Sequence, residues 1–350
     1  MRSFISAVLI AVLLAGCNRP FLTESRVTSS NHVVSENEVV LHTPPVQNAG
    51  PLLEMPVIGD QCSGKKVALI DVDGLLINEE RVGILSLGQN PVAMFREKLD
   101  YVACHPEFCG VVLRIHSPGG GVTAADIMAR DLEAFKQRTG LPVVACLMDV
   151  AAGGAYYLAA GADQIVAHPT TLTGGVGVVL NLYNLQDTLQ QFNIIPRTLK
   201  AGENIDTGTP LEPLPIKAEE RLQDIADEFH ARFIARVQQH RPVAAAADKR
   251  TFDGRVFTAV EAQTVGFIDQ IGYLDDAVAA AAGPYASMGV NAVMLHRRND
   301  WARSPYDISP NTPIQRTLFP LDVPGLVRSH LPTFMYLWQP DPSLPVTHKP

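Results

Sequence analysis

The strongest constraint on the fold comes from two apolar runs of strand length, at residues 110–115 and 142–148. Each run is followed by a glycine-rich turn and then by a helix-like segment. Short runs of this kind, bounded by glycine turns, are typical of buried strands. The repeated strand–turn–helix order predicts an α/β fold with a mostly parallel sheet. Because turns at the carboxyl ends of parallel strands collect binding sites, we expect the functional site at these two glycine-rich turns.

Further elements are predicted on both sides of these two strands. A strand is expected at residues 67–72 and a weaker one at 290–295. Apolar residues spaced three or four positions apart predict helices. The predicted helices cover residues 91–103, 122 or 123 to 137, 155–162, 217–240 and 274–282. These elements continue a β-α-β repeat through most of the chain.

Four segments of this region together match the motifs of one family. They read SPGGGV at 117–122, DVAAGGAYYLAAGAD at 149–163, TGGVGVV at 173–179 and GRVFTAVEAQTVGFIDQIGYLDDAV at 254–278. They resemble the signal peptide peptidase A, or protease IV, family of membrane-associated serine peptidases over roughly residues 65–285. The resemblance implies a Clp-protease/crotonase-like fold of repeated β-α-β units.

The resemblance also implies where a catalytic dyad would lie. In that family the nucleophile is a serine within D-V-A-A-S-G-G-Y-Y, and the general base is a lysine within K-S-G-x-x-K-D. The serine position is Gly153 in this chain, and the lysine position is Ile205. Glycine has no atom to acylate and isoleucine cannot take a proton, so we expect no intact catalytic residue. Gly120 and Gly154 remain candidates for oxyanion-hole N–H groups.

Other side chains could in principle replace the missing dyad. The candidate nucleophiles are Ser117, Thr170, Thr171 and Thr173. Ser and Thr in turns commonly bond to local backbone, so we adopt none of them as catalytic. Lys200 is a poor substitute base, because in an extended segment it would point away from the Ile205 position and lie roughly 16 Å from it. Tyr156 and Tyr157 are expected to be packing residues.

Residues 1–17 predict a bacterial lipoprotein signal peptide, with Cys17 as the lipidated first residue of the mature protein. An ordinary signal, with Cys17 unmodified, is the alternative. The resemblance to that lipoprotein class, with Asn18 following the cysteine, implies anchoring in the outer membrane, facing the periplasm. Residues 18–64, rich in Ser, Thr, Asn and Pro, predict a flexible tether. Residues 286–350 predict a proline-rich tail.

Composition limits the partners of this chain. A net charge of −8 without a basic stripe argues against nucleic acid. We expect no cofactor, and no metal site because Cys–His clusters at metal spacing are missing. Of the five cysteines, Cys104 and Cys109 are the preferred disulfide, and Cys146 is expected to be a buried hydrophobe. An aromatic cluster at 331–340 is expected to dock on its own domain, with a sister subunit or a membrane face as alternatives.

Three functions follow from these observations. The first is an envelope lipoprotein that keeps the family fold and binds peptides or unfolded segments without catalysis, as a homo-oligomer or beside a catalytically complete paralogue. The second is an active serine-type peptidase that degrades membrane-associated or signal peptides with an unidentified nucleophile. The third, remote function is a crotonase-like acyl-thioester enzyme, against which the export signal counts. The paired loss at Gly153 and Ile205 favours the first.

Overall fold

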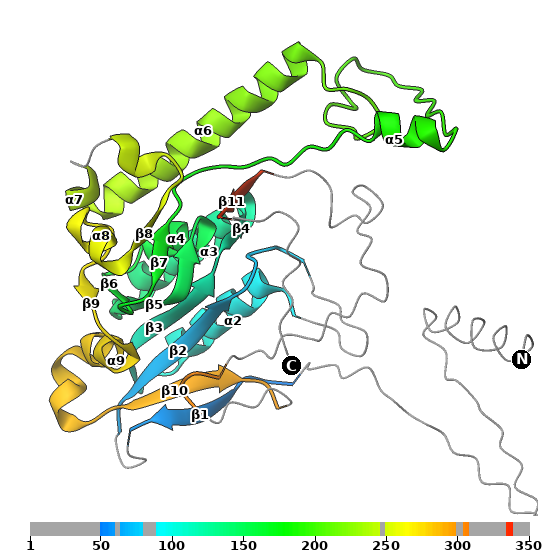
Figure 1. The fold of residues 1–350 in the computed structure, drawn as a ribbon. Helices are drawn as coiled ribbons and strands as arrows, with labels where there is room; N and C mark the ends of the chain where they lie inside the picture. The colour runs from blue at the N-terminus through cyan, green and yellow to red at the C-terminus, as the bar shows by residue number, and fades with distance from the viewer. Residues whose placement is uncertain are drawn as a thin grey trace, which may run out of the picture. The chain divides into compact units, whose positions relative to one another are not determined.

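A computed structural model describes residues 50–59, 64–79, 89–245, 249–298, 304–307 and 334–338. By its contacts the chain divides into residues 1–47 and residues 48–350, and every described residue belongs to the second unit. The predicted signal peptide with Cys17, most of the predicted tether, and Cys62 lie outside the described residues. Figure 1 shows the helices and strands of the described part.

One mixed, mostly parallel sheet forms the centre of this unit (Figure 1). Its strand order is β1 (Leu53–Ile58), β10 (Asn291–His296), β2 (Lys66–Asp73), β3 (Phe108–Ser117), β5 (Val143–Ala152), β6 (Gln164–Ala167) and β9 (Gln270–Ile271). β1 runs antiparallel to β10, and the other neighbours in this order are parallel. β7 (Leu172–Gly174) pairs parallel with the carboxyl end of β5 and antiparallel with β8 (Val256–Thr258). The predicted α/β fold is confirmed.

Helices cover both faces of the sheet, because the strands are apolar on both. Alternate residues of β2 divide between two buried clusters: Ala68 and Ile70 face one, and Val67 and Leu69 face the other. The first cluster includes residues of α2 (Pro91–Cys104), α3 (Val122–Thr139) and α4 (Gly154–Ala159). The second lies under α9 (Leu274–Ala282). Continuous apolar runs are what a parallel sheet buried on both faces requires.

The ends of the helices follow from capping residues. The Asn90 side chain accepts hydrogen bonds from the first turn of α2, including one of 2.9 Å from the Val92 N–H. α3 ends at Gly140, which adopts a left-handed conformation with φ 66°. Thr258 and Glu261 form a capping box at the start of α8 (Ala259–Thr264). The predicted helices are all present, including α6 (Ile216–His240).

The sheet extends beyond both predicted domain boundaries. β1 lies within the stretch predicted as a tether, and β10 lies within the predicted tail. β11 (Met335–Leu337) pairs antiparallel with β4 (Gly119–Gly121), which follows β3. The aromatic cluster near the C-terminus therefore docks on its own domain, as expected, through residues 334–338.

The predicted Cys104–Cys109 disulfide is not formed, and both thiols are free. Cys104 is exposed at the end of α2, on the side of the sheet that α2 covers. Cys109 is buried on the opposite side, under α9, and its thiol donates a hydrogen bond to the Lys66 carbonyl. Because the sheet separates the two side chains, the short spacer cannot join them. Cys146 is fully buried, as expected, and burial raises the pKa of its thiol to about 12.

Candidate functional site

The predicted nucleophile position lies where β5 turns into α4. Gly153 is buried, with φ 56° and ψ −128°, and its N–H donates to the Gly174 carbonyl at 3.0 Å. This conformation is strained for any residue with a Cβ atom, and glycine adopts it freely. The sharp turn that would present a nucleophile is thus kept, although the side chain is missing.

β4 forms the second wall of the site. On one edge it exchanges two hydrogen bonds of 2.9 Å with Leu76: the Leu76 N–H donates to Gly119, and the Gly121 N–H donates to Leu76. Its other edge pairs with β11, in a register that sets Gly120 opposite Tyr336. The Ser117 hydroxyl fixes the entry to this strand, because it donates to the Gly74 carbonyl at 2.5 Å and accepts from the Gly119 N–H. β4 is therefore held rigidly from one side.

β11 lies between two backbone partners. Met335 exchanges two hydrogen bonds of 2.9 Å with Val179, on the side away from β4. Toward β4, the Val122 N–H donates to Phe334 and the Trp338 N–H donates to Pro118. Hydrogen-bonded pairs alternate along an antiparallel ladder, so these two bonds make Gly120 and Tyr336 a hydrogen-bonded pair. The Gly120 N–H, a predicted oxyanion-hole donor, therefore faces the carbonyl oxygen of Tyr336.

The carbonyl of Tyr336 occupies the space where a nucleophile would stand. A Cβ atom at position 153 would collide with this oxygen and lie 2.8 Å from the Tyr336 carbonyl carbon. A Cβ atom at position 119 would meet the same oxygen and lie 2.7 Å from the Gly154 nitrogen. The structure thus brings Gly120, Gly153 and Gly154 together around one peptide carbonyl. Backbone N–H donors of this kind hold the reacting carbonyl in acyl-transfer enzymes, and here the strand register gives Gly120 as one donor to the Tyr336 carbonyl.

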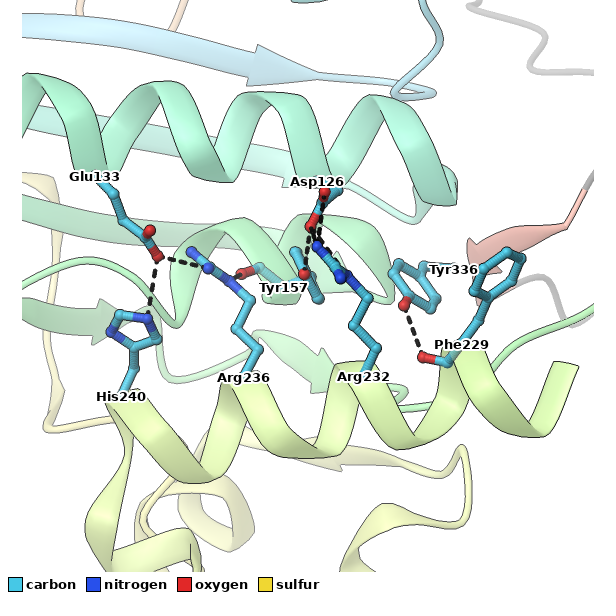
Figure 2. A network of polar contacts seen from close by, with 8 residues as sticks. All are labelled: Asp126, Glu133, Tyr157, Phe229, Arg232, Arg236, His240 and Tyr336. Atoms are coloured by element: carbon cyan, nitrogen blue, oxygen red, sulfur yellow. Dashed lines mark hydrogen bonds and ion pairs between the residues drawn. The ribbon is translucent and has the colours of Figure 1, made fainter. Parts of the chain in front are cut away.

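The Tyr336 side chain is buried against residues of α4 and α6, and Figure 2 shows it near Tyr157 and Phe229. Its ring has no exposed surface and lies 5.2 Å from the Tyr157 ring and 4.7 Å from the Phe233 ring, measured between centroids. Its hydroxyl donates a 2.7 Å hydrogen bond to the Phe229 carbonyl of α6. A buried tyrosine needs such a partner, and here the pocket supplies one.

Charged residues hold the pocket together from outside. The Tyr157 hydroxyl donates to Asp126 at 2.7 Å, and Arg232 of α6 donates to both oxygens of the same carboxylate (Figure 2). Burial alone would raise the pKa of Asp126, but the hydrogen bonds from Tyr157 and Arg232 hold it below its usual value. Burial and the Asp126 partner raise the pKa of Tyr157 to about 12. Asp126 is thus a carboxylate, and Tyr157 a neutral donor, at neutral pH.

Two more contacts from α6 clamp α4. The Arg236 guanidinium lies over the Tyr157 ring, 4.7 Å from its centroid, and donates to the Tyr157 carbonyl at 2.8 Å. It also pairs with Glu133 of α3 at 2.6 Å, and Nε2 of His240 lies 3.2 Å from the same carboxylate (Figure 2). The charged residues of this clamp are four positions apart along α6, a spacing that places them on one face of the helix. The sequence could have predicted this face, but not that it packs on α3 and α4.

The general-base position lies in a different environment. Ile205 is 74% exposed, in the segment between β7 and α6. Lys200, the alternative base, forms an ion pair with Asp206 at 2.9 Å. The hydrogen bond with Asp206 raises the pKa of Lys200, so this amine holds its proton more tightly than a free lysine. A group that must accept a proton is not improved by such a partner.

The substitute nucleophiles are bound to backbone, with one exception. The hydroxyls of Thr171 and Thr173 are buried and donate to the carbonyls of Leu147 and Ala151, at 2.9 and 2.6 Å. Ser117 donates to Gly74, as described above. Thr170 is exposed. Ser117 makes the local hydrogen bond expected of a turn residue, whereas Thr173 lies in β7 and bonds across to Ala151 of β5.

Two histidines of α6 also make specific contacts. The ring Nε2 of His230 lies 3.0 Å from the Val176 carbonyl and 2.7 Å from the Phe252 carbonyl, so it joins α6 to the β7–β8 side of the site. His240 contacts Glu133. Both lie on the face of α6 that its apolar periodicity directs toward the protein, so the sequence carried a signal for these contacts.

Among the described residues, no cluster of three or more His, Cys, Asp or Glu side chains has a metal-binding arrangement. No helix in the described ranges is both long and apolar enough to cross a bilayer.

Comparison with known proteins agrees with the motifs of the site. Residues 135–287 match the profile of Peptidase family S49. The chain is 26% identical to a putative signal peptide peptidase SppA of Enterococcus faecium, over 77% of this chain and 74% of the relative. It is 30% identical to a putative protease of Methanocaldococcus jannaschii, over 66% of this chain and 75% of the relative.

A plant relative matches over a smaller share of its length. The chloroplastic serine protease SPPA of Arabidopsis thaliana is 31% identical over 53% of this chain, which is 27% of that protein. The profile match includes the Gly153 turn, β7 and α6, and the fold is the α/β arrangement with a mostly parallel sheet that the motifs predict. The chain belongs to peptidase family S49, the family of signal peptide peptidase A and protease IV.

Proposed function

We propose that this chain is a non-catalytic member of its family that binds extended peptide segments along β4 and serves as a binding or scaffolding module. One observation carries the proposal: a strand lies on β4 with its carbonyl over position 153, and residue 153 is glycine. The site holds a peptide carbonyl where a peptidase would attack it, and no atom is there to attack. With Ile205 at the base position, no acyl-enzyme can form at these two positions.

The binding chemistry is that of strand addition. Main-chain hydrogen bonds from β4 and Val179 would fix an extended segment regardless of its sequence. The side-chain pocket between α3, α4 and α6 would add selectivity. Unfolded or membrane-released polypeptides are the class of partner that offers such extended segments.

The first test separates binding from turnover. The full chain, purified in detergent, is incubated with unstructured peptides and with a fluorophosphonate probe that labels activated serines. We expect no cleavage and no labelling, whereas the E. faecium relative, tested in parallel, checks the assay. Cleavage that is lost on labelling, with the label found on a side chain of this protein, would overturn the proposal.

We also propose that the chain acts in the cell envelope, held by lipid on Cys17 in the outer membrane and facing the periplasm. The apolar run and the LLAGC ending of residues 1–17 support this. Intact-mass measurement should find a diacylglyceryl and an acyl group on Cys17, and Cys17→Ser should release the chain from membrane fractions. An unmodified Cys17 in the mature chain would exclude the anchor.

Assembly is the remaining part of the proposal. The chain would act as a homo-oligomer, or beside a catalytically complete relative for which it holds extended segments. Sedimentation of the detergent-solubilised chain, alone and mixed with such a relative, distinguishes the two arrangements. A monomer in both experiments would remove this part and leave peptide binding unaffected.

A further inference from the structure

We propose that Arg114 is the receptor for a tight turn of this chain, residues 304–307, and that this turn is a strap that can open while the domain stays folded. The strap closes over the sheet near the carboxyl ends of β2 and β3, on the face that α9 covers. The inference concerns a conformational device of the fold, and it is independent of the proposed peptide binding.

The receptor is an ion pair that two neighbouring strands hold in place. Asp71 of β2 and Arg114 of β3 lie opposite each other in the parallel register. Nε of the guanidinium donates to the Asp71 carboxylate at 2.7 Å, and Nη2 lies 2.6 Å from the same oxygen. The side chains of Arg114 and Asp71 are only 5% and 4% exposed. A buried guanidinium needs partners for all its N–H groups, so Asp71 orients the fork and leaves donors on Nη1 and Nη2 for the strap.

The strap presents main-chain carbonyls to this fork. The Pro305 carbonyl accepts a hydrogen bond from Nη1 of Arg114, and the Asp307 carbonyl accepts one from Nη2. Hydrogen bonds inside the turn fix these carbonyls: the Asp307 N–H donates to the Ser304 carbonyl at 3.2 Å, and the Ser304 N–H donates to the Asp307 carboxylate at 2.8 Å. Serine followed by proline is a common start of such a turn. A planar fork that meets two fixed oxygen atoms makes a contact that lysine cannot reproduce.

The strap can open by itself because it contributes no side chain to the core. None of residues 304–307 belongs to either buried hydrophobic cluster, and the Tyr306 side chain is 57% exposed. Opening breaks the contacts with Arg114, while the pair with Asp71 stays in place. A segment held by few buried apolar contacts opens at a free energy well below that of global unfolding.

Limited proteolysis tests the strap, because chymotrypsin cleaves after tyrosine and needs a backbone that is free to enter its active site. The full chain, purified in detergent, is digested under native conditions, and cleavage between Tyr306 and Asp307 is followed by mass spectrometry. Each rate is divided by the rate for a synthetic peptide of residues 301–310. We expect the unaltered chain to be cleaved about a hundredfold more slowly than the peptide. Cleavage at the peptide rate would overturn the inference.

The receptor is tested by Arg114→Lys, which keeps a positive charge beside Asp71 but loses the fork. Cleavage after Tyr306 should become about tenfold faster. Arg138→Lys, at an exposed ion pair with Asp100, is the matched control and should leave the rate within about twofold of the unaltered chain. The same protection in Arg114→Lys as in the unaltered chain would refute Arg114 as the receptor.

A second variant tests the strap without changing a buried position. Ser304→Ala combined with Asp307→Ala removes the side-chain hydrogen bonds of the turn and leaves Arg114 intact. Cleavage should become faster relative to a peptide with the same two substitutions, while the melting temperature of the domain stays the same. Unchanged protection in this variant would show that the turn is not the unit that Arg114 holds.

Urea separates opening of the strap from unfolding of the domain. Opening exposes little surface, so the rate of cleavage after Tyr306 should stay nearly constant over the urea concentrations at which the domain remains folded. A cleavage rate that rises as steeply with urea as the global unfolding equilibrium would show that the strap opens only when the domain unfolds, and would overturn the inference.

Discussion

The two positions where the family motifs predict a nucleophile and a general base lie in contrasting parts of the molecule. Gly153 is buried in a left-handed turn and is covered by the backbone of β11. Ile205 lies in a segment whose apolar side chains are exposed: Phe192, Ile194, Ile195, Leu199 and Ile205. A change at the first position alters a packed groove, whereas a change at the second alters a surface. Substitutions at the two predicted positions should therefore have different structural consequences, and paired substitutions in the two parts can measure the difference.

The largest effect is expected from removing the same aromatic side chain in each part. Phe233→Ala empties a fully buried position under the pocket and should lower the free energy of unfolding by about 3–5 kcal/mol. Phe192→Ala removes a ring that is 73% exposed and should change it by about 0.5 kcal/mol or less. Chemical denaturation of both variants checks this. Equal losses of unfolding free energy in the two variants would mean that the two parts of the molecule do not differ in packing.

The next effect concerns the turn itself. Gly153→Ser combines backbone strain at positive φ, about 1–3 kcal/mol, with the collision against Tyr336. Gly283→Ser, at φ 52° and ψ −122°, has nearly the same backbone strain as position 153, but its Cβ would meet open space. Thermal unfolding should therefore show a clearly larger drop in melting temperature for the substitution at position 153. If the two substitutions lower the melting temperature equally, β11 does not press on position 153.

A smaller effect should appear on acidification. The pKa of Asp126 is held below its ordinary value, so its stabilising contribution is present at neutral pH. It is lost as the pH falls from the unfolded-state pKa, about 4, through the folded-state pKa. Asp126 and Arg232 are partly exposed, so the contribution is about 1 kcal/mol or less. Asp126→Asn should flatten this part of the pH profile, and Asp187→Asn, at an exposed site on α5 (Gln186–Gln191), should not.

The smallest effect is expected at the surface position. Ile205→Lys should change the free energy of unfolding by about 0.5 kcal/mol or less, because the side chain is largely in solvent. It should also give no peptide cleavage by itself, since position 153 still lacks a nucleophile. The double variant Gly153→Ser with Ile205→Lys should cleave peptides only after residues 334–338 have been removed. Cleavage by this double variant with residues 334–338 in place would show that β11 does not block the site.

The glycine turns and their flanking elements could be predicted because local patterns determine them. β3, β5, α3 and the turn at Gly153 follow from short apolar runs, glycines and caps within about fifty residues. The pocket could not be predicted, since Tyr336 and Phe229 meet only through the tertiary fold. β1 was missed because Pro56 argues against a central strand, whereas an edge strand tolerates a residue without an N–H. The disulfide was wrong because sequence distance does not reveal which side of a sheet a cysteine faces.

The edge strand β1 has a mechanical consequence. Force applied to the N-terminal side of the described unit enters it at β1, which is bound laterally to β10 alone in the sheet order. A side-chain clamp strengthens this joint: Glu54 pairs with Lys66 at 2.6 Å and accepts from the Tyr101 hydroxyl at 3.1 Å. Under load, the clamp would break and β1 would detach before the parallel strands separate, so the glycine turns would stay undisturbed when the edge strand is lost.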